Sequence, residues 1–381
     1  MKIVILLITC LSLLTGCWDR TELKELGIVL GIAIDKDPKT GEYILSSQIL
    51  RPSSLDAQSS SSAPPFEKVV TTGKTIYEAI RRANLEFDRK AFFAHNKVIM
   101  IHEDVAKEGM LPVLDSFKRG KQVRGFVYIC ITKGVQARKI LESSSSGIES
   151  QPSIHLKNMI ENTNLQFSAA KIDLLNFYKQ TLSSGIDPVV GVFEFEENNV
   201  SKKHVKLSGG AVFNKDKLVG FLNEKETRGF LLSKGEVKSG SLSVPSPIDE
   251  ERYESVEIKK ASAKITPNIK GDTISFTIRV TGEGIIVEQQ VTGTFNSESE
   301  QLEHMKKLEG KMKQLMEDEI NMAIEKAQKQ FKADIFGFGN TLNKENPKTW
   351  NKVKKDWNEQ YPDVSYTVNV NFSINSTGLM K

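Results

Sequence analysis

Apolar and polar positions along the first half of the chain predict strands that alternate with helices. The continuous apolar run LGIVLGIAID at 26–35 predicts a buried strand, and the alternating YILSSQILR at 43–51 predicts its neighbour. Apolar residues at helical spacing, from Ile76 to Phe87, predict an amphipathic helix. Further strands are predicted at 92–102 and 126–133, and further helices at 135–142 and 153–183. This alternation is typical of a mixed α/β module.

The second half groups its strands before one long helix. Two alternating segments, at 251–267 and 272–289, predict long strands, and shorter strands are predicted at 204–213 and 217–222. The stretch GSLSVPSP interrupts this pattern near residue 245. A helix over 299–333 and a final strand at 364–374 complete the segment. The grouping predicts an α+β fold for the whole chain, with a C-terminal domain of β-sheet and one long helix.

The long helix carries apolar residues at steps of three, four or five, from Leu302 to Phe331. We interpret this stripe as the face that packs on the chain's own sheet, because the steps are too irregular for strict heptads. A coiled coil that binds a partner is the alternative.

A change in composition divides the chain into two domains. The polar stretch EENNVSKK begins near residue 196 and separates the two patterns described above. We therefore predict an N-terminal domain over 17–199 and a C-terminal domain over 200–381, with a further split of the latter near residue 245 left open.

Residues 1–16 have the pattern of a signal peptide. Lys2 is followed by an apolar region of 12 residues, Ile3–Leu14. A membrane-spanning helix needs roughly 20 residues, so this segment predicts a secretory signal that is removed. The residues Leu14-Thr15-Gly16-Cys17 at its end resemble the bacterial lipobox.

The lipobox assigns a chemical role to Cys17. Its thiol would take a diacylglyceryl group as a thioether, and its amino group, freed by cleavage, would take a palmitoyl chain. More than one acyl chain holds a protein stably at a membrane, whereas a single chain is marginal. An ordinary signal peptide with a cysteine at this place by chance is the alternative.

Composition and charge indicate a folded protein that does not bind nucleic acid. The chain has 381 residues, 39% of them hydrophobic and 26% charged, which is enough for a buried core. Its formal net charge of +4 is too weak to indicate nucleic-acid binding, so no nucleic-acid partner is expected.

The residues that usually carry chemistry form no catalytic or metal-binding pattern. Cys130 lies in the apolar run FVYICITK and is predicted to be a buried small hydrophobe. The five histidines form neither an HExxH motif nor a pair at i and i+4, so a zinc hydrolase is unsupported. No G-x-S-x-G motif is present. We therefore expect no enzymatic activity, no catalytic or metal-binding residue and no cofactor.

Two glycine-containing stretches are interpreted as turns. VVTTGKT at 69–75 has half of a P-loop, but Lys68 stands where the first glycine is needed, so we predict a tight turn and a helix capped by Thr75. GFGN at 337–340 lacks the rest of a dinucleotide fingerprint, and Gly337 and Gly339 predict a tight turn after the long helix.

Four stretches together resemble the Ger(x)C family of spore germination lipoproteins, the C subunits of GerA-type nutrient germinant receptors. They are, in order, GCWDRTEL at 16–23, FFAHNKVIMIHEDVAKEGMLPVLDSFKRGKQVR at 92–124, GGAVFNKDKLVGFLNEKETRGFLLSKGEV at 209–237 and DIFGFG at 334–339. The resemblance runs from the leader almost to the C-terminus. The serine-rich loop at 52–65 departs from the family pattern.

The resemblance implies a function that the residue pattern alone does not give. Members of the family are anchored by their lipid on the outer face of the spore inner membrane. They work with two integral membrane subunits, of A and B type, in receptors for nutrients, and they are not known as enzymes. Their fold is mixed α/β in three modules. Only Cys17 has a chemical role that transfers to this sequence.

A solute-binding lipoprotein of an importer is the alternative function. It shares the lipobox but predicts two Rossmann-like lobes that close on a ligand cleft. The late β segments and the long helix of this chain argue against that architecture.

Overall fold

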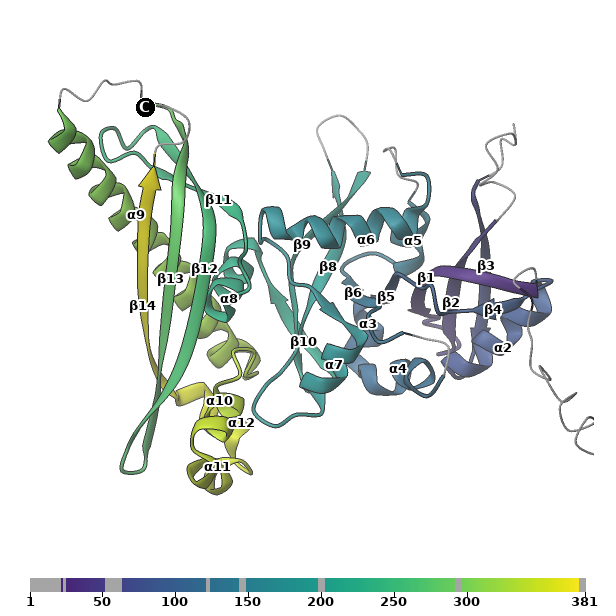
Figure 1. Ribbon diagram of the computed structural model, residues 1–381. Coiled ribbons are helices and arrows are strands. Elements are labelled where there is room, and N and C mark those ends of the chain that lie inside the picture. Colours follow the sequence, from purple (N-terminus) through teal and green to yellow (C-terminus); the bar gives the residue numbers. More distant parts are fainter. Residues whose placement is uncertain are drawn as a thin grey trace, which may run out of the picture.

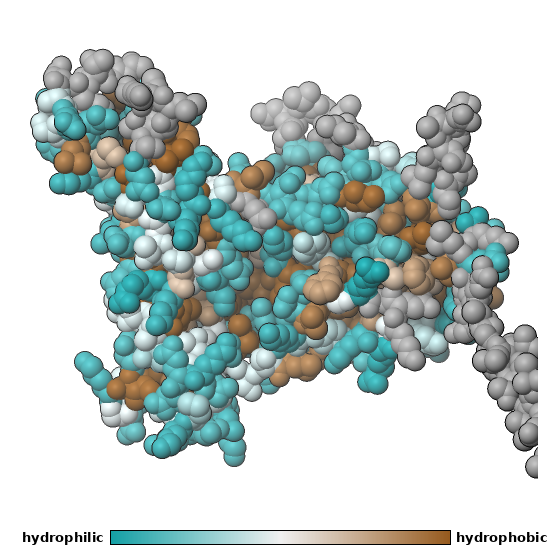
Figure 2. All heavy atoms as spheres, viewed as in Figure 1, coloured by the Kyte–Doolittle hydropathy of each residue, from teal (hydrophilic) through white to brown (hydrophobic). Residues whose placement is uncertain are grey.

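The computed structural model describes Glu22 and residues 25–51, 64–120, 124–143, 149–197, 203–291 and 297–376. These residues form two β-sheets, which lie at opposite ends of an elongated molecule (Figure 1). The surface seen in Figure 2 is mainly hydrophilic, with smaller apolar patches over the central elements.

The larger sheet has ten strands in the described part of the chain, in the order β10-β9-β8-β6-β5-β1-β2-β3, with β4 beside β1 and β7 beside β6. Its centre, β1-β5-β6-β8, is parallel, and both flanks are antiparallel. The strands are β1 Leu26–Lys36, β2 Tyr43–Leu50, β3 Phe66–Gly73, β4 Lys90–Phe92, β5 Val98–His102, β6 Tyr128–Thr132, β7 Ile172–Asp173, β8 Val189–Glu197, β9 Lys203–Asn214 and β10 Lys217–Leu222.

Helices cover both faces of this sheet, which explains why β1 and β5 are continuous apolar runs (Figure 1). One face carries α2 Ile76–Glu86, α3 Glu103–Glu108, α4 Met110–Arg119 and α7 Leu174–Thr181. The other face carries α5 Ala137–Glu142 and α6 Pro152–Asn162.

The smaller sheet has the strand order β11-β12-β13-β14, in which the last pair is parallel. Its strands are β11 Gly240–Pro245, β12 Tyr253–Lys270, β13 Thr273–Gln289 and β14 Ser365–Ser376. The helices of this part are α8 Glu224–Lys234, α9 Glu298–Glu325, α10 Phe338–Glu345, α11 Pro347–Val353 and α12 Trp357–Gln360.

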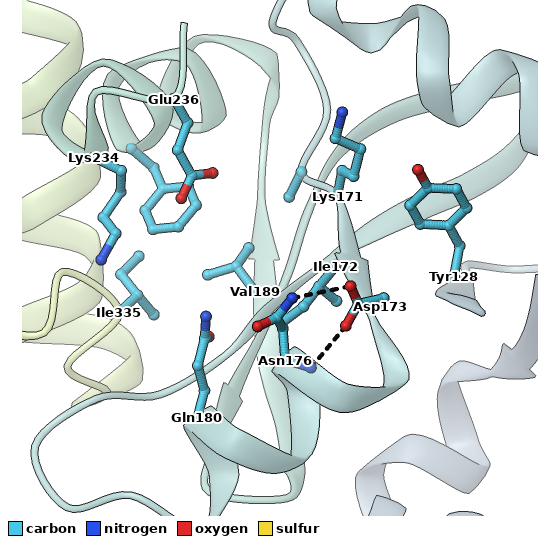
Figure 3. A pocket seen from close by; sticks show the side chains of 12 residues that line it. Tyr128, Lys171, Ile172, Asp173, Asn176, Gln180, Val189, Lys234, Glu236 and Ile335 are labelled. Carbon is cyan, nitrogen blue, oxygen red and sulfur yellow. Dashed lines mark hydrogen bonds between the residues drawn. The ribbon is translucent and has the colours of Figure 1, made fainter. Parts of the chain in front are cut away.

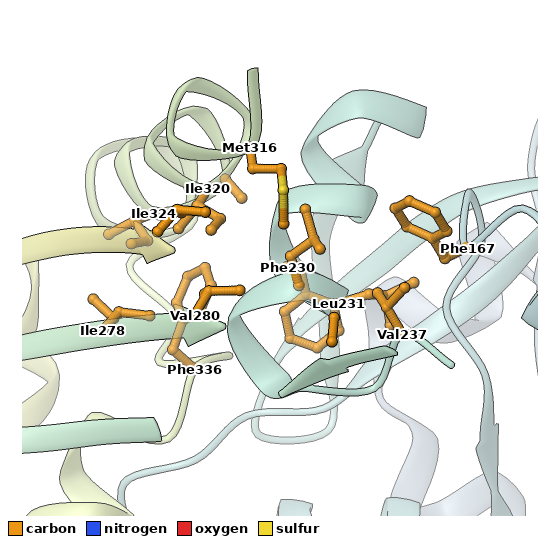
Figure 4. Packing of buried hydrophobic residues seen from close by; sticks show 14 of the residues in the cluster. Phe167, Phe230, Leu231, Val237, Ile278, Val280, Met316, Ile320, Ile324 and Phe336 are labelled. Carbon is orange, nitrogen blue, oxygen red and sulfur yellow. The ribbon is translucent and has the colours of Figure 1, made fainter. Parts of the chain in front are cut away.

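The apolar stripe of α9 packs on this sheet, together with α8 (Figure 4). Met312, Met316 and Ile320 are fully buried there, opposite Ile278 and Val280 of β13. The long helix therefore packs on its own sheet, as its irregular spacing predicts. A π-helical turn, Lys326–Phe331, ends it.

Several predicted elements need correction. The strand predicted at 92–102 is two strands, because the chain turns between β4 and β5, where Asn96 N–H donates to the Phe93 carbonyl at 3.0 Å. The helix predicted at 153–183 is α6 and α7, separated by β7, because Asp173 caps a new helix by accepting from Asn176 N–H at 2.7 Å.

Other elements of the structure, β8, α8 and β11 among them, were absent from the predicted pattern. Strand β8 begins with apolar residues and ends with charged ones, so the segment shows no clear strand pattern. In the sheet it pairs with β6 on one side and with β9 on the other. Helix α8 lies where no helix was expected. GSLSVP forms the edge strand β11, in which Leu242 and Val244 point into the core and Pro245 stands at the end.

The α+β fold class is confirmed, with mixed α/β modules and one long helix in the C-terminal part. The domain boundary at 199/200 stays a prediction. It lies between β8 and β9, which pair antiparallel within the larger sheet.

Candidate functional site

A pocket of about 380 Å³ lies where the larger sheet meets α8 and the segment after α9 (Figure 3). It is lined by Tyr128, Ala170, Lys171, Ile172, Asp173, Asn176, Gln180, Val189, Phe230, Lys234, Glu236 and Ile335. These side chains come from elements far apart in the sequence, so only the folded chain assembles the pocket.

Charged groups of both signs face this junction pocket. Burial lowers the pKa of Lys234, whose Nζ donates to the Phe336 carbonyl at 3.3 Å. Burial also lowers the pKa of Lys171 and raises the pKa of Glu236. The surrounding protein thus disfavours the charged forms of these three groups.

The floor of the junction pocket is fixed by the start of α7. Asp173 accepts from the backbone N–H of Asn176 at 2.7 Å and from Nδ2 of the same residue at 2.9 Å. None of the lining residues is a histidine, cysteine, serine or threonine. The arrangement is therefore suited to holding polar groups by charge and hydrogen bonds.

Behind the junction pocket, Asp334 organises the turn that follows α9. Its Oδ1 accepts from the N–H groups of Gly337 and Phe338 at 2.8 and 2.9 Å. Its Oδ2 accepts from Gly339 N–H at 2.8 Å and from Trp357 Nε1 at 3.0 Å. Burial raises the pKa of Asp334 to about 6, although these four donors favour the ionised form.

Asp187 connects this turn to the larger sheet. Its Oδ2 accepts from Asp334 N–H at 2.8 Å, and its own N–H donates to the Asp334 carbonyl at 2.9 Å. Its Oδ1 accepts from Lys215 N–H at 2.7 Å, at the turn between β9 and β10. Burial raises the pKa of Asp187.

Two glycines let the backbones approach at the same place. A Cβ on Gly339 would lie 2.7 Å from the Cα of Gly185 and 2.7 Å from Trp357 Nε1. Asn340 N–H donates to the Gly185 carbonyl at 2.8 Å. The segments 185–187 and 334–340 thus form one connection between the two parts of the molecule, which we call the aspartate connection.

The predicted site residues lie elsewhere. Cys17, the predicted lipidation site, lies outside the described residues. Cys130 is buried in β6, where burial raises the pKa of its thiol far above the usual range, as expected for an inert core residue. Thr75 caps α2 by accepting from Glu78 N–H at 3.1 Å, and Gly337 adopts a positive φ of 73° in the turn after α9, as predicted.

The histidines do not meet in a metal site. His304 is buried in the C-terminal part, with Nε2 3.0 Å from Oε2 of Glu254, a carboxylate that also accepts from Ser246 Oγ at 2.5 Å. His102 caps α3. Among the described residues, no group of three or more His, Cys, Asp or Glu side chains is placed to hold a metal ion.

No helix in the described ranges is long and apolar enough to span a membrane.

Two family models match the chain in series. The spore germination protein N-terminal domain matches residues 19–195, and the spore germination B3/GerAC-like C-terminal domain matches residues 208–378. The chain belongs to the Ger(x)C family of spore germination proteins.

Curated relatives of the Ger(x)C chain are similar over almost their whole length. Spore germination protein B3 of Bacillus subtilis (strain 168) is 27% identical over 96% of this chain and 95% of its own. Spore germination protein A3 of the same organism is 28% identical over 97% of both chains. Spore germination protein KC is 25% identical over 99% of this chain and 96% of its own.

A solved structure confirms the fold. The crystal structure of the GerBC protein aligns with a TM-score of 0.57 and 21% identity, over 90% of this chain and 96% of that one.

The segments that carry the Ger(x)C resemblance have identifiable structural roles. DIFGFG at 334–339 forms half of the aspartate connection. The segment 209–237 runs from β9 through α8 and supplies Lys234 and Glu236 to the junction pocket. Lys234 and Glu236 therefore lie in a segment that carries the family resemblance, whereas Lys171 and Gln180 lie outside all four such segments.

Proposed function

We propose that this Ger(x)C chain is the lipid-anchored, non-enzymatic C subunit of a nutrient germinant receptor. The observation that carries the proposal is the order of features along the chain: a lipobox ending at Cys17, then both germination-family domains over 19–195 and 208–378. In this proposal the subunit is required for nutrient-triggered germination. It is held by N-palmitoyl and S-diacylglycerol groups on Cys17 at the outer face of the spore inner membrane.

The partners in this proposal are two integral membrane subunits, of A and B type. Curated relatives named as spore germination proteins B3, KC and A3 support a shared role in germination. The fold supports the choice against the importer alternative, because one ten-stranded sheet packs beside a four-stranded sheet and α9 in place of two Rossmann-like lobes.

Germination of spores that lack the gene tests the proposed function. We expect loss of the response to one nutrient in a panel, with the response to calcium dipicolinate intact, because dipicolinate would act downstream of the receptor. Normal responses to every nutrient, in a strain without related receptor genes, would contradict the proposal.

The anchor is tested by Cys17→Ala in the full chain. We expect the variant to lose its acyl chains and, after removal of the signal by signal peptidase, to move from the membrane to the soluble fraction. Mass spectrometry of the N-terminal peptide and fractionation of spore membranes measure this. A variant that has lost residues 1–16 by mass, yet stays with the membrane and supports germination, would show that protein partners, and not lipid, hold the chain.

A further inference from the structure

The outer face of α2 combines exposed apolar and cationic side chains. Tyr77, Arg81 and Leu85 follow one another at i, i+4 and i+8, so they lie on the same side of the helix. Tyr77 is 60% exposed and Leu85 is 86% exposed, the highest value among the large hydrophobic residues of the described chain. A soluble helix normally turns such residues inward, so this face needs an explanation.

The charges around this face are mostly positive. Residues 74–90 carry five lysines and arginines and three carboxylates. Arg82 pairs with Glu78 at 2.6 Å, and Arg89 Nε lies 4.0 Å from Asp88. The remaining cations, Lys74, Arg81 and Lys90, are exposed and pair with no carboxylate among the described residues.

Two hollows border the same residues. A hollow of about 250 Å³ between α2 and α4 has Phe93 and Phe117 in its lining and Arg81 and Lys90 beside them. A wider, more open hollow along the end of α2 is lined by Leu85, by Arg81 and Lys90 again, and by the carboxylates of Glu78 and Asp88, which lie beside Arg82 and Arg89. Apolar recesses between exposed cations suit the junction of acyl chains and anionic head groups.

The position of Cys17 along the chain places this face near a membrane. Strand β1 begins at Leu26, which pairs with Lys90 of β4. Eight residues lie between Cys17 and Leu26, so the Cα atom of Cys17 lies at most about 30 Å from the Cα atom of Leu26. In Figure 1, α2 and β4 stand at the end of the molecule opposite the smaller sheet.

We propose that the α2 face, formed by Lys74, Tyr77, Arg81, Leu85 and Lys90, lies against an anionic lipid bilayer. This inference rests on the proposed lipid anchor at Cys17 and adds a second contact with the membrane. Tyr77 and Leu85 enter the head-group region, and the three unpaired cations neutralise anionic head groups. The contact orients the molecule with its smaller sheet away from the membrane.

A tethered chain tests this contact without the natural lipid. A chain that begins at residue 18 retains every described residue, and an N-terminal hexahistidine tag holds it on vesicles that contain a nickel-chelating lipid. Leu85→Cys carries a fluorophore that brightens in an apolar environment, while Cys130 is buried and stays unlabelled. Leu302→Cys on α9, where Leu302 is 54% exposed, is the matched control.

On phosphatidylcholine vesicles with phosphatidylglycerol, we expect the label at 85 to brighten about threefold and the label at 302 to stay unchanged. Adding Arg81→Glu and Lys90→Glu, or omitting phosphatidylglycerol, should abolish the increase. Each cation near an anionic surface contributes roughly a fivefold preference for it. Tyr77→Cys serves as a second labelled position in case Leu85→Cys melts at a lower temperature.

Equal signals at 85 and 302, or the same brightening without anionic lipid, would overturn the proposal. So would a label at 85 that brightens only when the purified membrane subunits are added, because a protein would then cover the face. The mass of the natural N-terminal peptide tests the anchor separately. If Cys17 is lipidated but the label at position 85 does not brighten, the proposed function is still supported and only the contact of α2 with the membrane is refuted.

Discussion

At the residue scale, Asp334 is a buried carboxylate that holds the turn after α9 by hydrogen bonds. It is buried at the aspartate connection, accepts four hydrogen bonds and has Asp187 as its charged neighbour. Every donor around it is fixed by the backbone or by the packed side chain of Trp357, so an amide, which has a single acceptor oxygen, cannot accept all four.

The raised pKa of Asp334 predicts a pH dependence of stability. Its pKa is about 6 in the folded chain against 3.8 for the unperturbed side chain, so the folded state holds a proton that the unfolded state has lost. Its contribution to the free energy of unfolding should therefore be full below about pH 4 and fall by about 3 kcal/mol as pH rises to about 6. Urea unfolding of the wild type and of Asp334→Asn, compared from pH 4 to 7, measures this.

The free energy of unfolding of the wild type minus that of Asp334→Asn should fall as pH rises to about 6 and then stay constant. Asp334→Asn should be less stable throughout, because its amide cannot accept from both Gly339 N–H and Trp357 Nε1. Parallel profiles for the two proteins would contradict the assignment of the titration to Asp334.

Gly339 and Gly310 form a matched pair of glycine substitutions. Gly339→Ala should destabilise the chain by about 1–3 kcal/mol or more, because its Cβ meets Gly185 and Trp357 at 2.7 Å. Gly310→Ala, on the exposed side of α9 with no atom within 4 Å, should stabilise it by about 0.5–1 kcal/mol. Thermal denaturation of both variants measures the difference, and similar losses at both positions would show that the close approach at Gly185 is unimportant.

At the scale of elements, the contact between α8 and α9 depends on one buried ion pair as well as on apolar packing. Arg228 of α8 donates to both carboxylate oxygens of Glu319 on α9, and one of these bonds, from Nε, measures 3.0 Å. The Glu319 side chain is fully buried, and burial raises its pKa while Arg228 opposes the shift. The pair therefore links α8 to α9 inside the core.

Arg228→Ala should therefore cost about 3–5 kcal/mol of stability, because it leaves the Glu319 carboxylate without its partner in the core. Lys307→Ala, which removes an exposed i, i+4 pair with Glu303 on the same helix, is the control and should leave the melting temperature unchanged. A double variant, Arg228→Ala with Glu319→Gln, should recover part of the loss. Equal melting temperatures for the two single variants would contradict this reading of the ion pair.

At the scale of the whole molecule, the larger sheet runs through the domain boundary expected from composition. Strands β9 and β10 follow residue 200 but complete the edge beside β8, and Phe213 and Leu218 join the core of the N-terminal part. The polar stretch near residue 200 thus connects two neighbouring strands of one sheet.

Truncation tests where the first folding unit ends. A chain from 18 to 199 would leave β8 as an unpaired, apolar edge, and such edges promote aggregation. A chain from 18 to 222 keeps β9 and β10. We expect the longer piece to yield more soluble, monomeric protein, measured by size-exclusion chromatography after expression. Equal solubility of the two pieces would support a boundary at 199/200.

The sequence by itself determined the elements whose signals are local. The apolar run of β1, the cap at Thr75, the stripe of α9 and the turn at Gly337 depend on neighbours a few residues apart, and each was predicted. The family resemblance also rested on short, ordered segments of sequence.

Only the tertiary structure decided what depends on distant partners. Strand β8 forms because β6 and β9 supply hydrogen-bond partners for its backbone N–H and C=O groups. Strand β11 forms because β12 does the same for it. The junction pocket and the aspartate connection join segments more than a hundred residues apart, such as Asp187 and Asp334. Local periodicity does not say which distant residue will accept a hydrogen bond from a given group or pack against it. Those partners are set by the packing of the complete chain.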